Sequence, residues 1–590
     1  MTLKLSGTLD IETSDWQTFA LGCTYNGSRA RIWYDGNAML DHLRSEGGTW
    51  YGHAAGIFDN LYFLELARIR GIACQVDRAQ HRVTRIVMGG LTLRDSYAVW
   101  PVPLDDICGA LGRPTPSLPW RCVCGHVCGG YCQIGPRAAE GDPDLEAYCT
   151  ADCRDLYDGL VLLRDFATEH KIRLKGTLGQ TAWLSAQDEL GVPDSTIDWN
   201  LWRHARRGDK GGRIAIVRPK ARGPGMHYDI CNAYPAQLAH MELPVGEVAE
   251  LGGTHALLAL GRERPGIYSL TVRVPDDSFL PPLPWHHGGI LAFPTGVFSG
   301  AWTLPEIGHA LDRGVEILEG HAALVFEATA PIFAPLVERW YAIRKKVGRK
   351  TPLGQWIGRL AKALTGKFAE RPNRSRVTMH PAEIKICTRA GACADGCTGE
   401  CGAYEQLDLF GEIWAIPYTR LGPSAYPQWS AYLRAGTRIQ WHEQAERFGK
   451  ELCFGNTDSL WITGRKIPQP TGSQLGQWEL QHAWRDLEVR SPGAYAFRRD
   501  DGGPLEIRGL PGLTEADWKR GTGMIERGVQ TFGRAVGTTK GLFHKRTRRW
   551  TLPEHERQIY GDRRIVSGGY TVPLAAQEIR ELVAAKRKRR

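Results

Sequence analysis

The chain has 590 residues, a formal net charge of +10 at pH 7 and 42% hydrophobic residues, enough to build more than one hydrophobic core. No apolar run approaches the roughly 18 residues that a membrane-spanning helix needs, and the N-terminal stretch MTLKLSGTLDIETSDW lacks the profile of a secretion signal. We therefore expect a soluble, cytoplasmic protein of several domains and exclude membrane and secreted classes.

The first part of the chain carries four acids in separated segments. Asp10 and Glu12 lie two apart on one face of a predicted strand, Asp59 lies near the start of a predicted helix, and Asp152 follows Tyr148 by one helical turn. Gathering such acids is costly unless divalent cations neutralise them. The set predicts in-line attack of water on a phosphodiester at two metal ions, with the Tyr148 hydroxyl orienting the water. The alternative is that each acid is a surface or capping residue.

The composition of the chain changes over residues 208–300. A GDKGGR stretch is followed by a predicted strand ending in Asp229 and then by a segment rich in glycine and proline. Much later, an Asn-Thr-Asp-Ser turn between two apolar runs predicts a tight hairpin with Asp458 at its reversal. If the hairpin lies beside the strand, the two carboxylates can share two magnesium ions that also hold a nucleoside triphosphate. Tyr234 would then lie under the sugar and exclude a 2′-hydroxyl, or it simply packs in the core.

A cationic helical region is predicted at about residues 332–368, between these two acids. Metal ions alone do not neutralise a triphosphate, so nucleotide binding needs some of these side chains, and we assign it to Lys346, Arg359 and Lys362. A solvated basic face is the alternative. The last five residues, Lys586–Arg590, are all cationic and form either a solvated tail or a phosphate-binding one.

The chain has 15 cysteines, an odd number that argues against a disulfide framework. Two sets of four are close enough in sequence to suit tetrahedral zinc or an iron-sulfur cluster, with reduced, unligated thiols as the alternative. These are Cys122, Cys124, Cys128 and Cys132, and, in a glycine-rich insert, Cys387, Cys393, Cys397 and Cys401. Cys149 and Cys153 are interpreted as packing residues.

These segments, in this order, resemble the motifs of family B DNA polymerases. The acids of the first part resemble the three exonuclease motifs (Asp10-Ile-Glu12, Phe58-Asp59 and Tyr148-x-x-x-Asp152). Lys210-Gly-Gly-Arg213 resembles the loop that links exonuclease and polymerase domains, and the segments holding Asp229 and Asp458 resemble the first and third polymerase motifs. Because the first motif begins at residue 10, the compact chain looks like the protein-primed branch of bacteriophages and linear plasmids.

The resemblance implies a multidomain fold of α/β and α+β parts: an RNase H-like 3′→5′ exonuclease followed by a right-hand palm, fingers and thumb. The expected boundaries are 1–190 for the exonuclease, 191–330 for the linking loop and first palm part, 331–370 for the fingers, 371–490 for the cysteine-containing insert and second palm part, and 491–590 for the thumb and tail. Gly211, Gly212, Arg213 and Tyr495 are expected to contact DNA.

The implied function is DNA-templated DNA synthesis with proofreading, in viral or plasmid replication. It would use Mg²⁺ or Mn²⁺, primer-template DNA, deoxynucleoside triphosphates and a terminal protein primer, in the host cytoplasm if the protein is viral. Two alternatives stay open: a stand-alone 3′→5′ exonuclease whose polymerase module has decayed, and a non-catalytic DNA-binding replication scaffold.

The sequence departs from the family pattern at several positions. Asn456 replaces an acid, which lowers activity without removing it if that acid only supports the site, and Ala54 and Ala55 replace the asparagine of the second exonuclease motif. Gly358 stands where the fingers helix of the family has a lysine. Asp209 replaces the tyrosine of the linking loop, and only Tyr495 survives of a Lys-x-Tyr motif.

Overall fold

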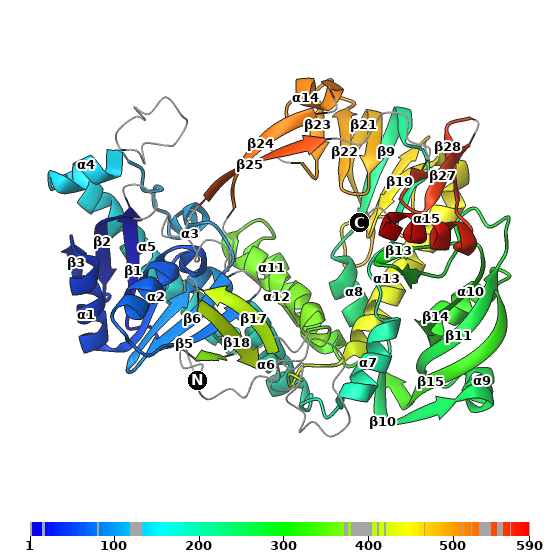
Figure 1. Cartoon of the computed structure of the whole chain (residues 1–590), viewed down its shortest axis with the longest axis horizontal. Helices are drawn as coiled ribbons and strands as arrows, with labels where there is room; N and C mark the ends of the chain where they lie inside the picture. Colours follow the sequence, from blue (N-terminus) through cyan, green and yellow to red (C-terminus); the bar gives the residue numbers. More distant parts are fainter. Residues whose placement is uncertain are drawn as a thin grey trace.

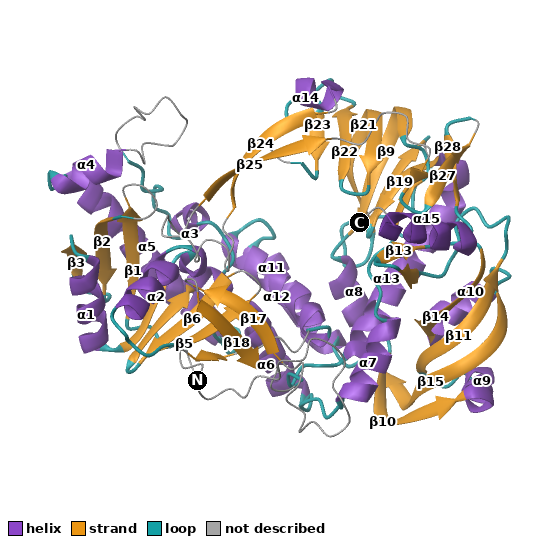
Figure 2. Ribbon diagram, viewed as in Figure 1, coloured by secondary structure: helices purple, strands orange, loops and turns teal. Residues whose placement is uncertain are grey.

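A computed structural model of the chain describes residues 3–13, 18–79, 82–118, 133–370, 376–378, 404–409, 412–417, 421–464, 466–510, 513–520, 522–529, 544–551, 559–566 and 568–588. Helices and sheets contribute to every part of it (Figures 1 and 2). Within those ranges, none of the helices combines the length and the apolar character needed to cross a membrane.

The N-terminal part is built on an eight-stranded mixed sheet. Strand β1 (Gly7–Thr13), an inner strand of this sheet, pairs antiparallel with β2 (Phe19–Tyr25) and parallel with β4 (Gly48–Gly52). Leu9 and Ile11 of β1 are buried in an apolar core with α1 (Gly36–Glu46) and α2 (Asp59–Ile69), so the alternate residues Asp10 and Glu12 face the other side. The sheet is completed by β3 (Ala30–Trp33), β5 (Gln75–Ala79), β6 (Arg82–Met88), β7 (Leu91–Asp95) and β16 (Arg376–Thr378).

The long helix α5 (Pro143–Glu169) covers that other side. Asp142 caps its start and Pro143 occupies the first turn, where a missing N–H costs nothing. Cys149 and Cys153 are fully buried against β1 and β2, as predicted for packing residues, and the Thr8 hydroxyl donates to the Cys153 carbonyl at 2.7 Å. The smaller helical elements of this part are Ala55–Ile57, Ser96–Ala98, α3 (Leu104–Ala110) and α4 (Ile134–Ala139).

A seven-stranded antiparallel sheet forms the second large unit, on the right of Figure 1. Strand β9 (Lys220–Ile230) lies between β20 (Ser459–Thr463) and β21 (Trp478–Ser491). The helices α8 (Ala233–His240) and α13 (Pro427–Phe448) pack together next to it. The other strands are β8 (Ile214–Ile216), β19 (Leu452–Asn456), β22 (Ala494–Arg499) and β23 (Glu506–Arg508).

The predicted long basic helical region is two helices, α11 (Ala334–Val347) and α12 (Pro352–Phe368). The break falls at Gly348, whose φ of 91° ends α11, and Thr351 caps α12 by accepting from Gly354 N at 3.1 Å. The pair lies between the two large sheets (Figure 1), and α12 packs against α6 (Leu178–Leu190), α8 and α13.

The remaining elements surround this frame. A four-stranded sheet holds β10 (Leu243–Gly252), β15 (Glu316–Ala330), β11 (Gly266–Val274) and β14 (Gly296–Thr303) in that order. Its neighbours are α7 (Trp199–Gly208), α9 (Gly253–Gly261), α10 (Leu304–Leu311), β12 (Trp285–His287), β13 (Ile290–Ala292) and α15 (Ala576–Lys588). The others are β17 (Tyr404–Leu409), β18 (Glu412–Pro417), Gly449–Glu451, α14 (Glu515–Arg520), β24 (Thr522–Val529), β25 (His544–Thr551), β26 (Ile559–Tyr560), β27 (Arg563–Val566) and β28 (Tyr570–Pro573).

Candidate active sites

The structure brings the predicted N-terminal acids together. Asp10, Glu12 and Asp152 each offer a carboxylate oxygen within 4.8 Å of the others. Asp59, at the start of α2, is buried beside them and accepts a hydrogen bond from Ile11 N at 3.1 Å. Tyr148 hydrogen-bonds to Asp152, as its position one turn earlier on α5 predicts. We call these four acids and the tyrosine the N-terminal cluster.

The acids of the N-terminal cluster resist ionisation. Burial, followed by the charges of its three neighbours, raises the pKa of Asp10 well above the usual value. Burial first and then the charges of Asp152 and Asp59 raise the pKa of Glu12 to about 8. Burial also raises the pKa of Asp59 and of Asp152 to about 7. Converging carboxylates of this kind fit a pair of hard divalent cations, whose charge would favour the ionised forms.

The second predicted pair is also adjacent in the fold. Strands β9 and β20 pair so that Ser459 lies opposite Asp229, and Ile230 N donates to the Asp458 carbonyl at 2.8 Å. Burial, and next the charge of Asp458, raises the pKa of Asp229 to about 7. Burial likewise raises the pKa of Asp458. Asp229, near the end of β9, and Asp458, in the turn before β20, thus place two half-buried carboxylates side by side, and we call them the palm pair.

The charge of Lys362 acts on both acids of the palm pair. This lysine is exposed on α12, and its charge lowers the pKa of both Asp229 and Asp458. Lys346 is exposed at the end of α11, and Arg359 is half-buried on α12. Neither side chain forms an ion pair with another residue that the structure describes. The structure therefore brings Lys362 to the acids and leaves the roles of Lys346 and Arg359 as predictions.

The predicted linking loop contacts the hairpin that carries Asp458. Thr457, in the left-handed conformation with φ of 61°, donates its N–H to the Arg213 carbonyl at 2.7 Å. A Cβ on Gly212 would lie 2.5 Å from Thr457 Cγ2, so only glycine fits there. Arg438, ion-paired with Glu306, donates to the Gly211 carbonyl at 2.9 Å. The two glycines thus let the loop lie against the turn.

The side chain of Arg213 does not have the environment predicted for a DNA contact. It is 2% exposed, donates to the Pro281 carbonyl at 2.7 Å and lies over the rings of Phe293 and Trp441. Buried in this way, the guanidinium is not available to DNA, contrary to the prediction. The cause is a packing contact between segments distant in sequence, which the Gly-Gly-Arg pattern does not reveal.

Tyr234 and Tyr495 both lie near the palm pair. Tyr234, half-buried in the first turn of α8, has its pKa raised by burial, and the charge of Asp458 adds to this effect. Burial also raises the pKa of Tyr495, whose ring packs against Phe454 and Trp461 with centroids at 5.1 and 5.7 Å. Their positions are compatible with the predicted nucleotide and DNA contacts, which stay predictions.

Glu479 is an acid near the palm pair that the sequence reasoning missed. It lies opposite Asp229 in the pairing of β9 with β21, and its charge contributes to the raised pKa of Asp229. The available signal in the sequence was an acid directly after Trp478. The structure shows that Trp478 is fully buried at the start of β21. Without the pairing register that signal does not say which residue lies opposite.

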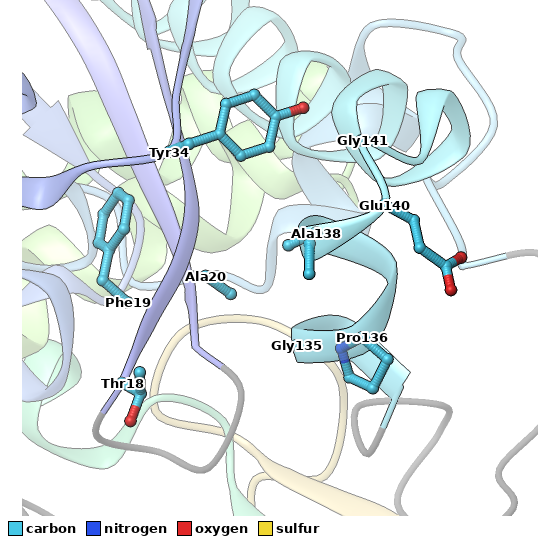
Figure 3. A pocket seen from close by; sticks show the side chains of 10 residues that line it. Thr18, Phe19, Ala20, Tyr34, Gly135, Pro136, Ala138, Glu140 and Gly141 are labelled. Atoms are coloured by element: carbon cyan, nitrogen blue, oxygen red, sulfur yellow. The ribbon is translucent and has the colours of Figure 1, made fainter.

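The two predicted cysteine sets, Cys122, Cys124, Cys128 and Cys132, and Cys387, Cys393, Cys397 and Cys401, lie outside the described residues. A surface hollow is found near the start of β2, where Phe19, Ala20 and Tyr34 face Pro136 and Ala138 of α4 (Figure 3). None of the acids of the N-terminal cluster or the palm pair lines it, so the hollow is separate from both candidate sites.

Comparisons with known proteins support this interpretation of the geometry. Residues 145–400 match the family described as DNA polymerase type B, organellar and viral. No curated protein matches the chain.

Solved structures of phi29 DNA polymerase match almost the whole chain. Its complex with primer-template DNA and incoming nucleotides is 14% identical, with a TM-score of 0.70 over 94% of this chain and 100% of that one. Its complex with primer-template DNA is 14% identical, with a TM-score of 0.68 over 93% and 100%. Its complex with single-stranded DNA is 15% identical, with a TM-score of 0.64 over 93% and 100%.

The predicted multidomain fold of α/β and α+β parts is therefore confirmed, and the predicted DNA-directed DNA polymerase agrees with the family that matches. At such low identity the solved structures establish the fold alone. The resemblance of this chain to the family B DNA polymerases is thereby confirmed, and in fold it extends to a bacteriophage member.

Proposed function

We propose that the chain is a DNA-templated DNA polymerase with a 3′→5′ exonuclease, and that it replicates viral or plasmid DNA in the host cytoplasm. The observation that carries the proposal is the palm pair, two half-buried carboxylates, one in β9 and one in the turn before β20, that Lys362 faces from α12. The deoxynucleoside triphosphate and the primer-template DNA are its substrates. A terminal protein primer is proposed as a further partner.

The palm pair is the centre of synthesis in this proposal. Asp229 and Asp458 would hold Mg²⁺ or Mn²⁺, which lowers the pKa of an attacking hydroxyl and neutralises phosphate charge. Lys362 supplies positive charge next to the acids, where a triphosphate needs it. Tyr234, in the first turn of α8, borders the sugar and selects against a 2′-hydroxyl. Asn456, two residues before Asp458, accepts a hydrogen bond from the Thr457 hydroxyl at 3.3 Å.

The N-terminal cluster is the centre of degradation. Asp10, Glu12, Asp59 and Asp152 would hold the same kind of cation, and Tyr148, through its bond to Asp152, orients the attacking water. The proposed domain boundaries are those that the resemblance implies: exonuclease 1–190, linking loop and first palm part with an insert 191–330, fingers 331–370, cysteine-containing insert and second palm part 371–490, and thumb and tail 491–590. Zinc or an iron-sulfur cluster at the two cysteine sets stays a prediction, which elemental analysis of the purified chain tests.

Primer extension tests the proposal. A labelled primer-template incubated with deoxynucleotides, Mg²⁺ and the protein should be extended, and Asp458→Asn should slow extension by about 10³-fold, because a ligand worth several kcal/mol is lost. Asp277→Asn, which alters an exposed aspartate, is the matched control and should extend normally. Undiminished extension by Asp458→Asn contradicts the proposal.

The same assay separates the alternatives. A protein that shortens the primer but never extends it is a stand-alone exonuclease. One that binds the DNA equally with and without divalent metal and leaves it unaltered is a scaffold. Adding a candidate terminal protein in place of the primer tests the priming mode.

A further inference from the structure

The thiol of Cys149 contacts an acid of the N-terminal cluster. Cys149 is fully buried on α5, and its Sγ donates to Asp10 Oδ2 at 3.4 Å. The same sulfur lies 3.9 Å from the Asp10 carbonyl oxygen, so it contacts both the side chain and the main chain of this residue. Cys149 therefore packs between the helix and the sheet and also limits how the Asp10 carboxylate can turn.

Two further hydrogen bonds hold this part of α5 against the sheet. Cys153, one turn after Cys149, donates its thiol to the Cys23 carbonyl at 3.5 Å. The Thr8 hydroxyl donates to the Cys153 carbonyl at 2.7 Å. Cys23 is the residue of β2 that pairs with Asp10 of β1. The helix is thus fixed at the level of the sheet where Asp10 lies, which keeps the Cys149 thiol beside that carboxylate.

Neighbouring residues of α5 bond to acids on two different elements. Tyr148 hydrogen-bonds to Asp152 on the same helix, and Cys149 reaches across to Asp10 on β1. The carboxylates of Asp10 and Asp152 lie within 4.8 Å of each other, so they repel one another when both are ionised. Each donor is neutral, and it can hold its carboxylate in place without adding a positive charge that would repel a cation.

We propose that Cys149 is a positioning residue of the exonuclease site, whose thiol holds the Asp10 carboxylate in the orientation that binds a divalent cation. The inference rests on the proposed degradation at the N-terminal cluster. A donor that orients a carboxylate before the cation arrives strengthens binding, because less freedom of the side chain is lost on binding. Without the donor, the neighbouring acids would turn Asp10 away from them.

The Mg²⁺ requirement of the exonuclease tests the inference. Cys149→Ala removes the donor, and Cys149→Val removes it while filling the space of the thiol. Both should raise the Mg²⁺ concentration for half-maximal degradation of a single-stranded 3′ end about tenfold, with the KM for DNA at saturating Mg²⁺ unchanged. Cys149→Ser keeps a hydroxyl donor and should recover most of the loss.

Cys108 of α3 provides a matched control. It is fully buried, and its thiol donates at 3.5 Å to Oδ2 of Asp155, an acid outside the N-terminal cluster that Arg113 also holds, at 2.6 Å. Cys108→Ala removes the same side-chain volume and the same kind of bond from this part of the chain, so the Mg²⁺ requirement should stay as it is. Primer extension by each variant checks that the chain has folded.

Metal binding measures the effect without turnover. Calorimetric titration with Mn²⁺ is carried out on the DNA-free protein carrying Asp458→Asn, which disables the palm pair as a cation site. In this background Cys149→Val should weaken Mn²⁺ binding about tenfold, Cys149→Ser much less and Cys108→Ala not at all.

The inference is overturned if Cys149→Val keeps both the Mg²⁺ requirement and the Mn²⁺ affinity within about twofold of their starting values. It is also overturned if Cys149→Ser loses as much as Cys149→Val, or if Cys108→Ala has an equal effect, since packing would then explain the loss. Failure of the proposed function would look different. If the unaltered protein degrades no DNA in Mg²⁺ or Mn²⁺, the exonuclease proposal fails, whereas an active exonuclease that is indifferent to Cys149 contradicts only this inference.

Discussion

The two acid sites differ in the charges around them. In the N-terminal cluster, carboxylates surround carboxylates, and the charges of Asp152 and Asp59, which raise the pKa of Glu12, are both negative. The palm pair has Lys362 in front of it, which holds down the pKa of both acids. A site that only cleaves needs no charge for a triphosphate, whereas a site that binds one does. The contrast therefore follows from the two proposed reactions.

Separating the two activities gives the largest expected effect. Asp152→Ala should reduce degradation of a single-stranded 3′ end by about 10³-fold and leave primer extension unchanged, because the loss of one acid disrupts only its own cation site. Asp458→Asn should do the reverse. Gel assays with and without deoxynucleotides measure both. If either variant lost both activities together while still folded, the two sites would not be independent.

The pH dependence of the metal requirement should differ between the activities. A carboxyl group whose pKa is raised must lose its proton before it holds a cation, so the Mg²⁺ concentration for half-maximal activity should fall about tenfold per pH unit and per proton released. For the exonuclease the fall should continue at least to about pH 8, because burial and neighbouring acids raise the pKa of Glu12 to about 8 and also raise the pKa of Asp10. For synthesis it should level off near pH 7, where Asp229 titrates.

Removing the lysine should make the palm pair resemble the N-terminal cluster. Lys362→Met takes away the charge that lowers the pKa of Asp229 and Asp458, so the pH profile of synthesis should move upward. Synthesis at pH 7 should fall several-fold, and the exonuclease profile should stay in place. Lys345→Met, on the exposed face of α11, is the control, and an identical shift there would remove Lys362 from the account.

The smallest expected effect concerns stability without metal. Because Glu12 has its pKa raised from 4.5 to about 8, the folded chain binds more protons than the unfolded one between these values, and stability falls as pH rises through them. Glu12→Gln should therefore raise the melting temperature of the metal-free protein at pH 8 by about 2–4 °C, and should have little effect near pH 4. Glu46→Gln, an exposed acid of α1, should change neither. Scanning calorimetry in a chelator measures this, and an increase of equal size at both pH values would contradict it.

The local geometry of two acid motifs could be predicted from the sequence, because the residues of each motif lie in one strand or one helix. Asp10 and Glu12 share a strand face, and Tyr148 reaches Asp152 across one helical turn, so their geometry needs only the period of the element. The meeting of Asp229 with Asp458 needed the family resemblance as well. Residues brought in by tertiary packing could not be predicted: Glu479 depends on strand register, and Arg213 is buried by segments far away in the chain.

The break in the predicted long helical region also separates what is local from what depends on tertiary packing. Gly348 and Thr351 carry local signals for an end and a start, and they divide α11 from α12. What those signals do not give is the angle at which the helices pack, and with it the contact of Arg344 with Gly358.

The central claim is that one chain holds two separate divalent-cation sites, one for synthesis and one for degradation. Anomalous scattering from crystals of the full chain soaked in Mn²⁺ tests it most directly. The account predicts manganese both between Asp229 and Asp458 and among Asp10, Glu12 and Asp152. Crystals that hold manganese at the N-terminal acids but none at Asp229 and Asp458, with DNA and nucleotide present, would contradict it.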